Sequence, residues 1–323
     1  MVQVSVSELQ SCGAYTDIAA LLKLRFAAKD LQLSTRESRA SLTGGARTRF
    51  RGRGMEFEEV RVYHPGDDIR TIDWRVTART NVPHTKLFRE ERERPTFVAA
   101  DQRSSLFFGS QRCFKSVLCA HLASLVAWAS LHNNDRVGGL VFGNDDHRDI
   151  RPRRSKHAVL ELVQQLDHYN HALTSPLVSE RHLPLAKVLQ DMRRIARPGS
   201  AVYLISDFQD YDQDCREHLY FLARHTDVTL FQVADPLEQA LPATGLLTVS
   251  DGRQRLQIAA DNPHLRERFH ARYQERFEQL KAHSQSLKIP LYAFSTAGDE
   301  ITQMRRIFSR GKASQKGRGW TRA

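Results

Sequence analysis

Three aspartates close apolar runs whose length and composition are typical of buried strands. The runs are TFVAAD, AVYLISD and VTLFQVAD, and they end at Asp101, Asp207 and Asp235. Because the crevice of an open parallel sheet lies beyond the carboxyl ends of its strands, we expect these side chains to converge at one edge. Carboxylates gathered at such an edge can hold a cation, either a metal ion or a basic side chain.

Arg103 lies between Asp101 and Ser105 in the sequence and argues against a metal. A guanidinium in the pocket would repel a metal cation and would itself fill the position between the carboxylates of Asp101 and Asp207. Our preferred hypothesis is a rim without a cofactor, stabilised by an internal arginine–aspartate pair. Such a pair would be partly buried, so its loss would destabilise a loop rather than abolish a reaction.

A second group of acids lies in EFEEVRVYHPGDDIRTIDWRVTART, residues 56–80. Two adjacent carboxylates can act as acid and base or as metal ligands. We prefer a structural or docking role, because four nearby arginines can neutralise the acids through charge-assisted pairs that fix a turn. Aromatic side chains would anchor that turn. The motif residues that we single out are Arg61, Tyr63, Gly66, Asp67, Asp68, Arg70, Asp73, Trp74 and Arg79.

Strands that alternate with long helices must position these groups. Periodicity predicts helices near residues 111–131, 156–166, 182–194 and 263–286, and strands at 96–101, 136–142, 201–207, 228–235 and 290–295. Right-handed crossovers then make the sheet mainly parallel, a doubly wound α/β fold of the Rossmann-like kind. Residues 246–258 predict a hairpin that turns at Asp251 and Gly252.

Composition divides the chain into four segments. The apolar pattern of residues 1–33 predicts an N-terminal helix. The pattern of residues 34–94 predicts a small β-rich module. Residues 95–296 hold the α/β pattern. We expect the basic segment 297–323 to be disordered, because from Arg305 onward it contains no acid and no periodic apolar face.

A net charge of +11 and a pI near 9.7 admit acidic proteins, anionic lipid and nucleic acid as partners. The stretch from Arg47 to Arg53 and the basic tail can contact RNA, so nucleic-acid binding is an alternative to protein docking. The cysteine spacing, the N-terminus and the lack of a membrane-spanning run indicate the cytoplasm. No hydrolase elbow, Walker loop or zinc-protease motif is present, so we expect no enzyme activity.

The 56–80 motif resembles the signature of domain-of-unknown-function family 58. Between Phe57 and Arg79 the chain carries aromatic–Glu–x–x–Arg–x–Tyr, Pro-Gly-Asp-Asp, Arg–x–Ile–Asp–Trp and Ala-Arg, and Asp-Pro-x-Glu follows at 235–238. These bacterial proteins are commonly associated with MoxR-type AAA+ ATPases. The resemblance implies a chaperone-like adaptor that cooperates with such an ATPase in the maturation or assembly of other proteins.

The resemblance also implies a von Willebrand factor A-like domain with a degenerate metal-ion-dependent adhesion site. That site combines Asp–x–Ser–x–Ser, a later threonine and a late aspartate. Asp101 and Ser105 match the first element and Asp207 matches the last, but Arg103 replaces a serine and Thr174 is only a distant candidate for the threonine. A magnesium-dependent binding module is therefore a further alternative.

Overall fold

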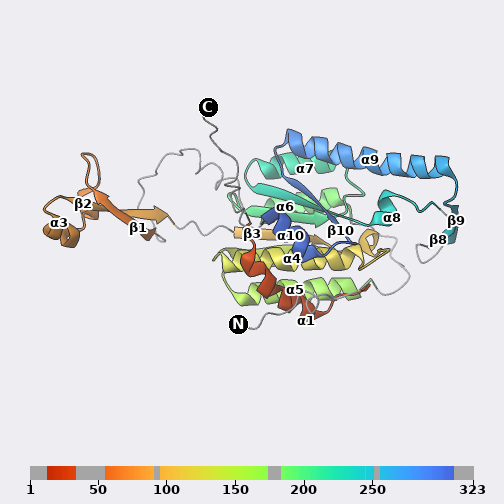
Figure 1. Ribbon diagram of the computed structural model, residues 1–323, viewed down its shortest axis with the longest axis horizontal. Coiled ribbons are helices and arrows are strands. Elements are labelled where there is room, and N and C mark those ends of the chain that lie inside the picture. The colour runs from red at the N-terminus through yellow and green to blue at the C-terminus, as the bar shows by residue number, and fades with distance from the viewer. Residues whose placement is uncertain are drawn as a thin grey trace, which may run out of the picture. The chain divides into compact units, whose positions relative to one another are not determined.

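The computed structural model describes residues 13–33, 55–90, 95–173, 183–243, 245–250 and 255–308. The chain forms two compact units (Figure 1). One unit, Ala40–Glu93, is called the signature unit below. The other combines Met1–Arg39 with Arg94–Ala323 and is called the sheet unit. The predicted N-terminal segment 1–33 therefore belongs to the same unit as the sheet.

A six-stranded sheet in the order β10-β7-β6-β3-β4-β5 is the centre of the sheet unit. Every neighbouring pair is parallel except β4 and β5, so the predicted doubly wound, mainly parallel α/β fold is confirmed. The sequence does not predict edge strand β5, because only Ile150 of its residues is buried. The strands are β3 Pro95–Asp101, β4 Arg136–Phe142, β5 His147–Arg153, β6 Ala201–Ser206, β7 Asp227–Ala234 and β10 Leu291–Ser295.

Helices cover both faces of this sheet (Figure 1). Val98 and Ala100 of β3 face one group of helices, and Phe97 and Ala99 face the other, because successive side chains of a strand alternate. The first group is α1 Ile18–Ala27, α4 Lys115–His132, α5 Lys156–His171 and α10 Glu300–Phe308. The second is α6 Leu185–Ile195, α7 Gln213–Ala223 and α9 Pro263–Ser286.

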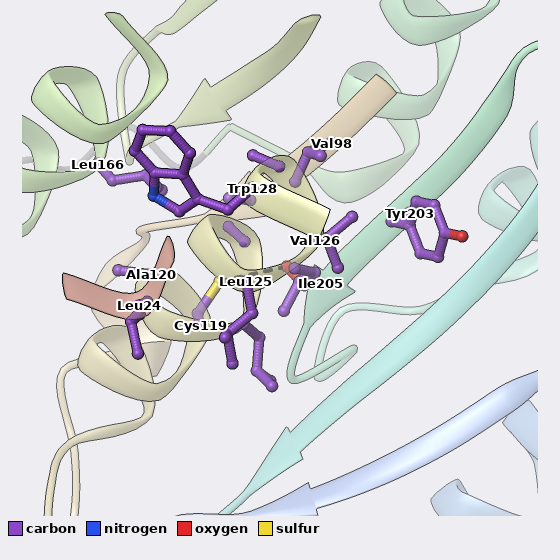
Figure 2. Packing of buried hydrophobic residues seen from close by; sticks show 14 of the residues in the cluster. Leu24, Val98, Cys119, Ala120, Leu125, Val126, Trp128, Leu166, Tyr203 and Ile205 are labelled. Carbon is purple, nitrogen blue, oxygen red and sulfur yellow. Dashed lines mark hydrogen bonds between the residues drawn. The ribbon is translucent and has the colours of Figure 1, made fainter. Parts of the chain in front are cut away.

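Helix α4 is buried from Lys115 to Ser130, which is typical of a helix that is apolar all round. Figure 2 shows its Cys119 and Trp128 among core side chains, with the Cys119 thiol donating to the Ile205 carbonyl at 3.6 Å. Burial raises the pKa of the Cys119 thiol well above its ordinary value, so this cysteine is an inert small hydrophobe. Among the described residues, no helix has both the length and the apolar composition needed to cross a membrane.

The segment after residue 297 differs from its prediction. Disorder is the wrong expectation as far as Phe308, because α10 is a helix whose Ile301, Met304 and Phe308 are buried. These three residues share one helix face. The charges of Arg305 and Arg306 between them obscure that stripe in the sequence. Residues 309–323 lie outside the described part of the chain.

Smaller elements connect these helices and strands. The predicted hairpin is confirmed as β8 Leu246–Ser250 paired with β9 Arg255–Ala259, and its turn lies outside the described residues. Two single turns, η2 Ala28–Asp30 and η4 Ser104–Leu106, follow α1 and β3. A short helix, α8 Pro236–Gln239, follows β7 and begins with a capping box formed by Asp235 and Glu238.

In the signature unit, β1 Met55–Val62 pairs antiparallel with β2 His84–Glu90, so the predicted small β-rich module contains a two-stranded sheet. Between them the chain forms η3 Ile69–Thr71 and α3 Trp74–Thr80. The sequence analysis does not predict α3, because seven residues are too few for a periodic apolar face. Its local signals are the Asp73 side chain, which accepts two backbone N–H groups at the start, and left-handed Asn81 at the end.

Candidate functional site

The strand order places a topological switch point between β3 and β6. In an open α/β sheet the ligand crevice lies there, beyond the carboxyl ends of the strands. Asp101 is the last residue of β3 and Asp207 follows β6 directly. Ser206 Oγ donates to Asp101 Oδ2 at 2.6 Å and ties the two strand ends together. The expected convergence of Asp101 and Asp207 at one edge of the sheet is therefore present.

Arg103 is fully buried at this edge, and its guanidinium bonds both carboxylate oxygens of Asp101. Its Nε lies 3.0 Å from Asp101 Oδ1, and its Nη2 lies 2.7 Å from Oδ2. The same guanidinium reaches Asp210, with Nη1 at 2.6 Å from Oδ2. The predicted arginine–aspartate pair exists, but the second partner of Arg103 is Asp210 and not Asp207. The reason is the direction of the chain after β6, which turns Asp210 toward Arg103.

The charged states of this pair follow from burial and contact. Burial raises the pKa of Asp101, and the bonded guanidinium of Arg103 opposes that shift. Burial acts to lower the pKa of Arg103, but Asp101 and Asp210 raise it above its ordinary value. Arg103 is therefore a fixed cation that neutralises the carboxylates of Asp101 and Asp210.

Lys115 neutralises Asp207, and the sequence analysis missed it. The ammonium group lies 3.0 Å from Asp207 Oδ2 and 2.6 Å from Glu238 Oε1, and its side chain is fully buried. Burial acts to lower the pKa of Lys115, whereas the two carboxylates raise it above its ordinary value. The available signal is a lysine at the first position of the otherwise apolar helix KSVLCAHLASLVAWASL. A buried ammonium requires such partners.

These residues do not fit a divalent cation. Both oxygens of Asp101 are bonded to Arg103, and Asp207 is paired with Lys115. Ser105 Oγ is buried and has no hydrogen-bond partner within the part of the chain that the structure describes. Across the same residues, no three His, Cys, Asp or Glu side chains gather as a metal site. A metal would have to displace two fixed cations, and Thr174 lies outside the described residues.

The third strand-end aspartate, Asp235, has a structural environment. It accepts from the Ser110 backbone N–H at 2.8 Å and from Thr296 Oγ1 at 2.6 Å, and it caps α8. Burial acts to raise the pKa of Asp235, but these hydrogen bonds lower it. Asp235 therefore connects the ends of β7 and β10 to the loop before α4.

In the signature unit, Asp67 forms the ion pair expected of the motif. Arg61 Nη2 lies 2.8 Å from Asp67 Oδ1, and the His64 N–H donates to Oδ2 at 2.9 Å. The hydrogen bond from Arg61 is the main cause that lowers the pKa of Asp67. The Tyr63 hydroxyl donates to the Asp67 carbonyl at 3.3 Å. Gly66 has a φ of 105°, a conformation that favours glycine, so the turn depends on it.

The rest of the motif departs from its prediction. Asp68 accepts the Arg70 backbone N–H at 3.0 Å, and Asp73 caps α3, so both carboxylates accept from backbone groups. Asp73 is also paired with a cation, because its Oδ2 lies 3.4 Å from the ammonium group of Lys86. Arg70 and Arg79 are exposed. Trp74 is 67% exposed, so the expectation that it anchors the turn is wrong. The reason is that it begins a short helix in which no residue is buried.

A family model described as "Protein of unknown function DUF58" matches residues 59–279, which is more than half of the chain. The chain belongs to this family. Uncharacterized proteins of Mycobacterium bovis and Mycobacterium tuberculosis are each 29% identical to it over 206 residues, which cover 62% of this chain and 61% of each relative. This DUF58 chain thus spans 61% of the length of the curated relatives that it matches.

Several solved structures are similar to this DUF58 protein, among them the following two. The conserved hypothetical protein BatB from Bacteroides thetaiotaomicron is 15% identical, with a TM-score of 0.38 over 66% of this chain and 99% of that one. A von Willebrand factor type A protein from Catenulispora acidiphila is 13% identical, with a TM-score of 0.31 over 47% of this chain and 35% of that one. Neither likeness bears on function, and the doubly wound α/β fold rests on the sheet topology.

Proposed function

We propose that this chain is a non-catalytic adaptor that binds other proteins and cooperates with a MoxR-type AAA+ ATPase in their maturation or assembly. The observation that carries this proposal is apolar exposure on the signature unit. Its large apolar side chains Trp74, Ile69, Val62 and Val82 are 67%, 64%, 45% and 43% exposed. Large apolar side chains exposed together in one small unit are candidates for an interaction surface, and tryptophan is among the residue types enriched in binding hot spots. We call these four residues the signature surface.

The strand-end carboxylates support the non-catalytic part of the proposal. A general acid or base needs an available proton site, and a metal needs free lone pairs. Arg103 and Lys115 occupy the carboxylates of Asp101 and Asp207 instead. The ATPase partner comes from the family resemblance of the 56–80 motif. We propose the cytoplasm as the location, because Cys119 and Cys215 are reduced thiols.

The test is retention of the purified chain on an immobilised MoxR-type ATPase from the same bacterium. Trp74→Ala and Ile69→Ser should each weaken retention by roughly thirtyfold, the factor that corresponds to about 2 kcal/mol for a hot-spot residue. Tyr220→Ala is the matched control, because Tyr220 is an exposed aromatic residue of α7 in the sheet unit. Undiminished retention of the Trp74 and Ile69 variants would refute the assignment of the signature surface.

Charge reversal separates electrostatic docking from apolar docking. Asp68→Lys and Arg70→Glu change exposed side chains, whereas Asp67 must be left intact because it holds the turn through Arg61. If the partner recognises these charges, both variants should associate more slowly with it. The difference in association rate from the unaltered chain should become smaller at high salt. Retention that does not depend on salt in any variant would leave the apolar side chains as the sole determinant.

Nucleic-acid binding is the second candidate, and one cleft favours it. A cleft of about 690 Å³ at the amino ends of β3 and β4 is lined by Arg136, Arg151, Arg153 and Arg197. The planar guanidinium group of arginine can donate to two oxygens of one phosphate group. If all four contacted duplex phosphates, log K would fall against log salt with a slope of about −3.6. Arg151→Glu with Arg153→Glu should reduce that slope. An unchanged slope in the double variant would exclude the cleft.

A further inference from the structure

Helix α1 carries a row of apolar side chains on the side that faces away from the core. The helix packs on α4 and α5, and its Leu21 and Leu24 are fully buried there (Figure 1). Ile18 and Phe26 lie on another side of the helix and are 40% and 42% exposed. They are eight residues apart with half-buried Leu22 midway, a spacing that places all three on one helix face. We call Ile18, Leu22 and Phe26 the outer stripe.

The composition of α1 is apolar all round. Its sequence IAALLKLRFA has two charged residues, Lys23 and Arg25. A helix of this composition is normally buried on all sides. In α1 the core takes up the side that carries Leu21 and Leu24, so the outer stripe remains open to a further partner. The helix also precedes residues 59–279, which match the family model, so the family assigns it no role.

Three cations accompany the outer stripe. At about 100° per residue, Lys23 and Arg25 lie on opposite flanks of Phe26, and Lys29 follows in η2. The Arg25 guanidinium carbon lies 4.5 Å from the centre of the Phe26 ring, and Lys29 Nζ lies 5.9 Å from it. These cation–π contacts hold two positive charges at the apolar side chain. Within the part of the chain that the structure describes, none of the three cations forms an ion pair.

The acids of this segment are engaged elsewhere. Among residues 13–33 they are Asp17 and Asp30. The Asp17 side chain caps α1 by accepting two backbone N–H groups. Asp30 Oδ2 lies 3.2 Å from Arg305 Nη2 on α10. The positive charges beside the outer stripe are therefore left for an external anion.

We infer that α1 binds the surface of an anionic lipid bilayer through the outer stripe. In such a site the apolar side chains enter the boundary between headgroups and acyl chains to roughly 5–10 Å, while Lys and Arg stay near the lipid phosphates. A bilayer deforms around a single convex helix, whereas a protein would need a matching concave groove with acidic walls. This inference goes beyond the proposed adaptor function and does not depend on the signature surface.

Sedimentation of the full chain with vesicles tests the contribution of charge. The chain should bind vesicles of phosphatidylcholine with about 30% phosphatidylglycerol and bind pure phosphatidylcholine far more weakly. Lys23→Gln with Lys29→Gln should weaken binding roughly thirtyfold, the factor that corresponds to about 1 kcal/mol for each cation. Arg268→Gln with Arg272→Gln is the matched control, because both arginines are exposed on α9, on the other face of the sheet.

Two substitutions without a change of charge separate α1 from other basic parts of the chain. Phe26→Ser and Ile18→Ser should each weaken binding to the same vesicles roughly fivefold, which corresponds to about 1 kcal/mol for burial of the exposed part of each side chain. Tyr220→Ser is the control, because Tyr220 is an exposed aromatic residue of α7. Melting curves establish that each variant is folded, and two separate positions keep the test valid if one variant unfolds.

The outcomes divide clearly. Weaker binding of the α1 variants than of both controls would support the inference. Equal binding by all variants and the unaltered chain, or no binding to the anionic vesicles, would overturn it. Poly-L-glutamate identifies the other class of partner. If the polymer binds through Lys23 and Lys29 while the vesicles do not bind, the outer stripe is a surface for an acidic protein, and the lipid assignment is wrong.

Discussion

Replacing Arg103 with methionine should destabilise the protein severely, because it leaves a buried carboxylate without its cation. The side chains of Arg103 and Asp101 are 1% and 0% exposed, so water cannot take over the role of the guanidinium. Removing one partner of a buried ion pair costs about 3–5 kcal/mol. With roughly 2–4 °C in Tm per kcal/mol for a unit of this size, we expect Arg103→Met to melt about 6–20 °C lower than the unaltered chain.

Two further measurements separate charge from packing. In the double variant Asp101→Asn with Arg103→Met no buried charge is left unpaired, so part of the lost stability should return. In Arg103→Met alone, burial raises the pKa of Asp101 without opposition from the guanidinium. A carboxyl whose folded pKa lies above its unfolded value destabilises the fold above the unfolded pKa. The deficit should therefore shrink as pH falls from about 7 toward 4.

Urea unfolding followed by circular dichroism provides the assay. Arg194→Met is the matched control, because the Arg194 side chain is 74% exposed and its nearest carboxylate oxygen lies 3.9 Å away. An exposed pair of this kind contributes at most about 1 kcal/mol. If Arg103→Met costs no more than Arg194→Met, then Arg103 is not the cation that neutralises the strand ends.

Three other predictions concern the core. Burial acts to raise the pKa of Glu300, but His121 and Arg112 lower it from 4.5 to about 2. The stabilisation that ionised Glu300 contributes to the fold is therefore complete above pH 4.5 and is lost as pH falls toward 2. Between these pH values, the free energy of unfolding of Glu300→Gln should fall by about 3 kcal/mol less than that of the unaltered chain. Phe308→Ala should cost about 3–5 kcal/mol in urea unfolding if α10 belongs to the core, and a change below about 0.5 kcal/mol would contradict that placement. Cys119 should react with a thiol reagent only after unfolding, and rapid labelling of the native chain at this residue, measured by mass spectrometry, would contradict its burial.

Elements whose signals are local can be predicted from the sequence alone. Strand β4 spans Arg136–Phe142 and helix α9 spans Pro263–Ser286, the same residues that the apolar patterns predict. The reason is that period and capping depend only on neighbours in the chain. Alternation of such elements also implied the parallel sheet and placed Asp101 and Asp207 at one edge, since parallel strands end on the same side.

Which charges meet at that edge depends on the folded arrangement of distant segments. Lys115 pairs with Asp207 and Glu238 across 92 and 123 residues, and Arg103 reaches Asp210 across 107. No local pattern specifies these partners, because they depend on where separate loops emerge from the folded sheet. The same reason explains α10, whose stripe of Ile301, Met304 and Phe308 becomes recognisable as core only where the helix packs. A side chain's propensity is local, but neutralisation of a buried charge requires a partner brought near by the whole fold.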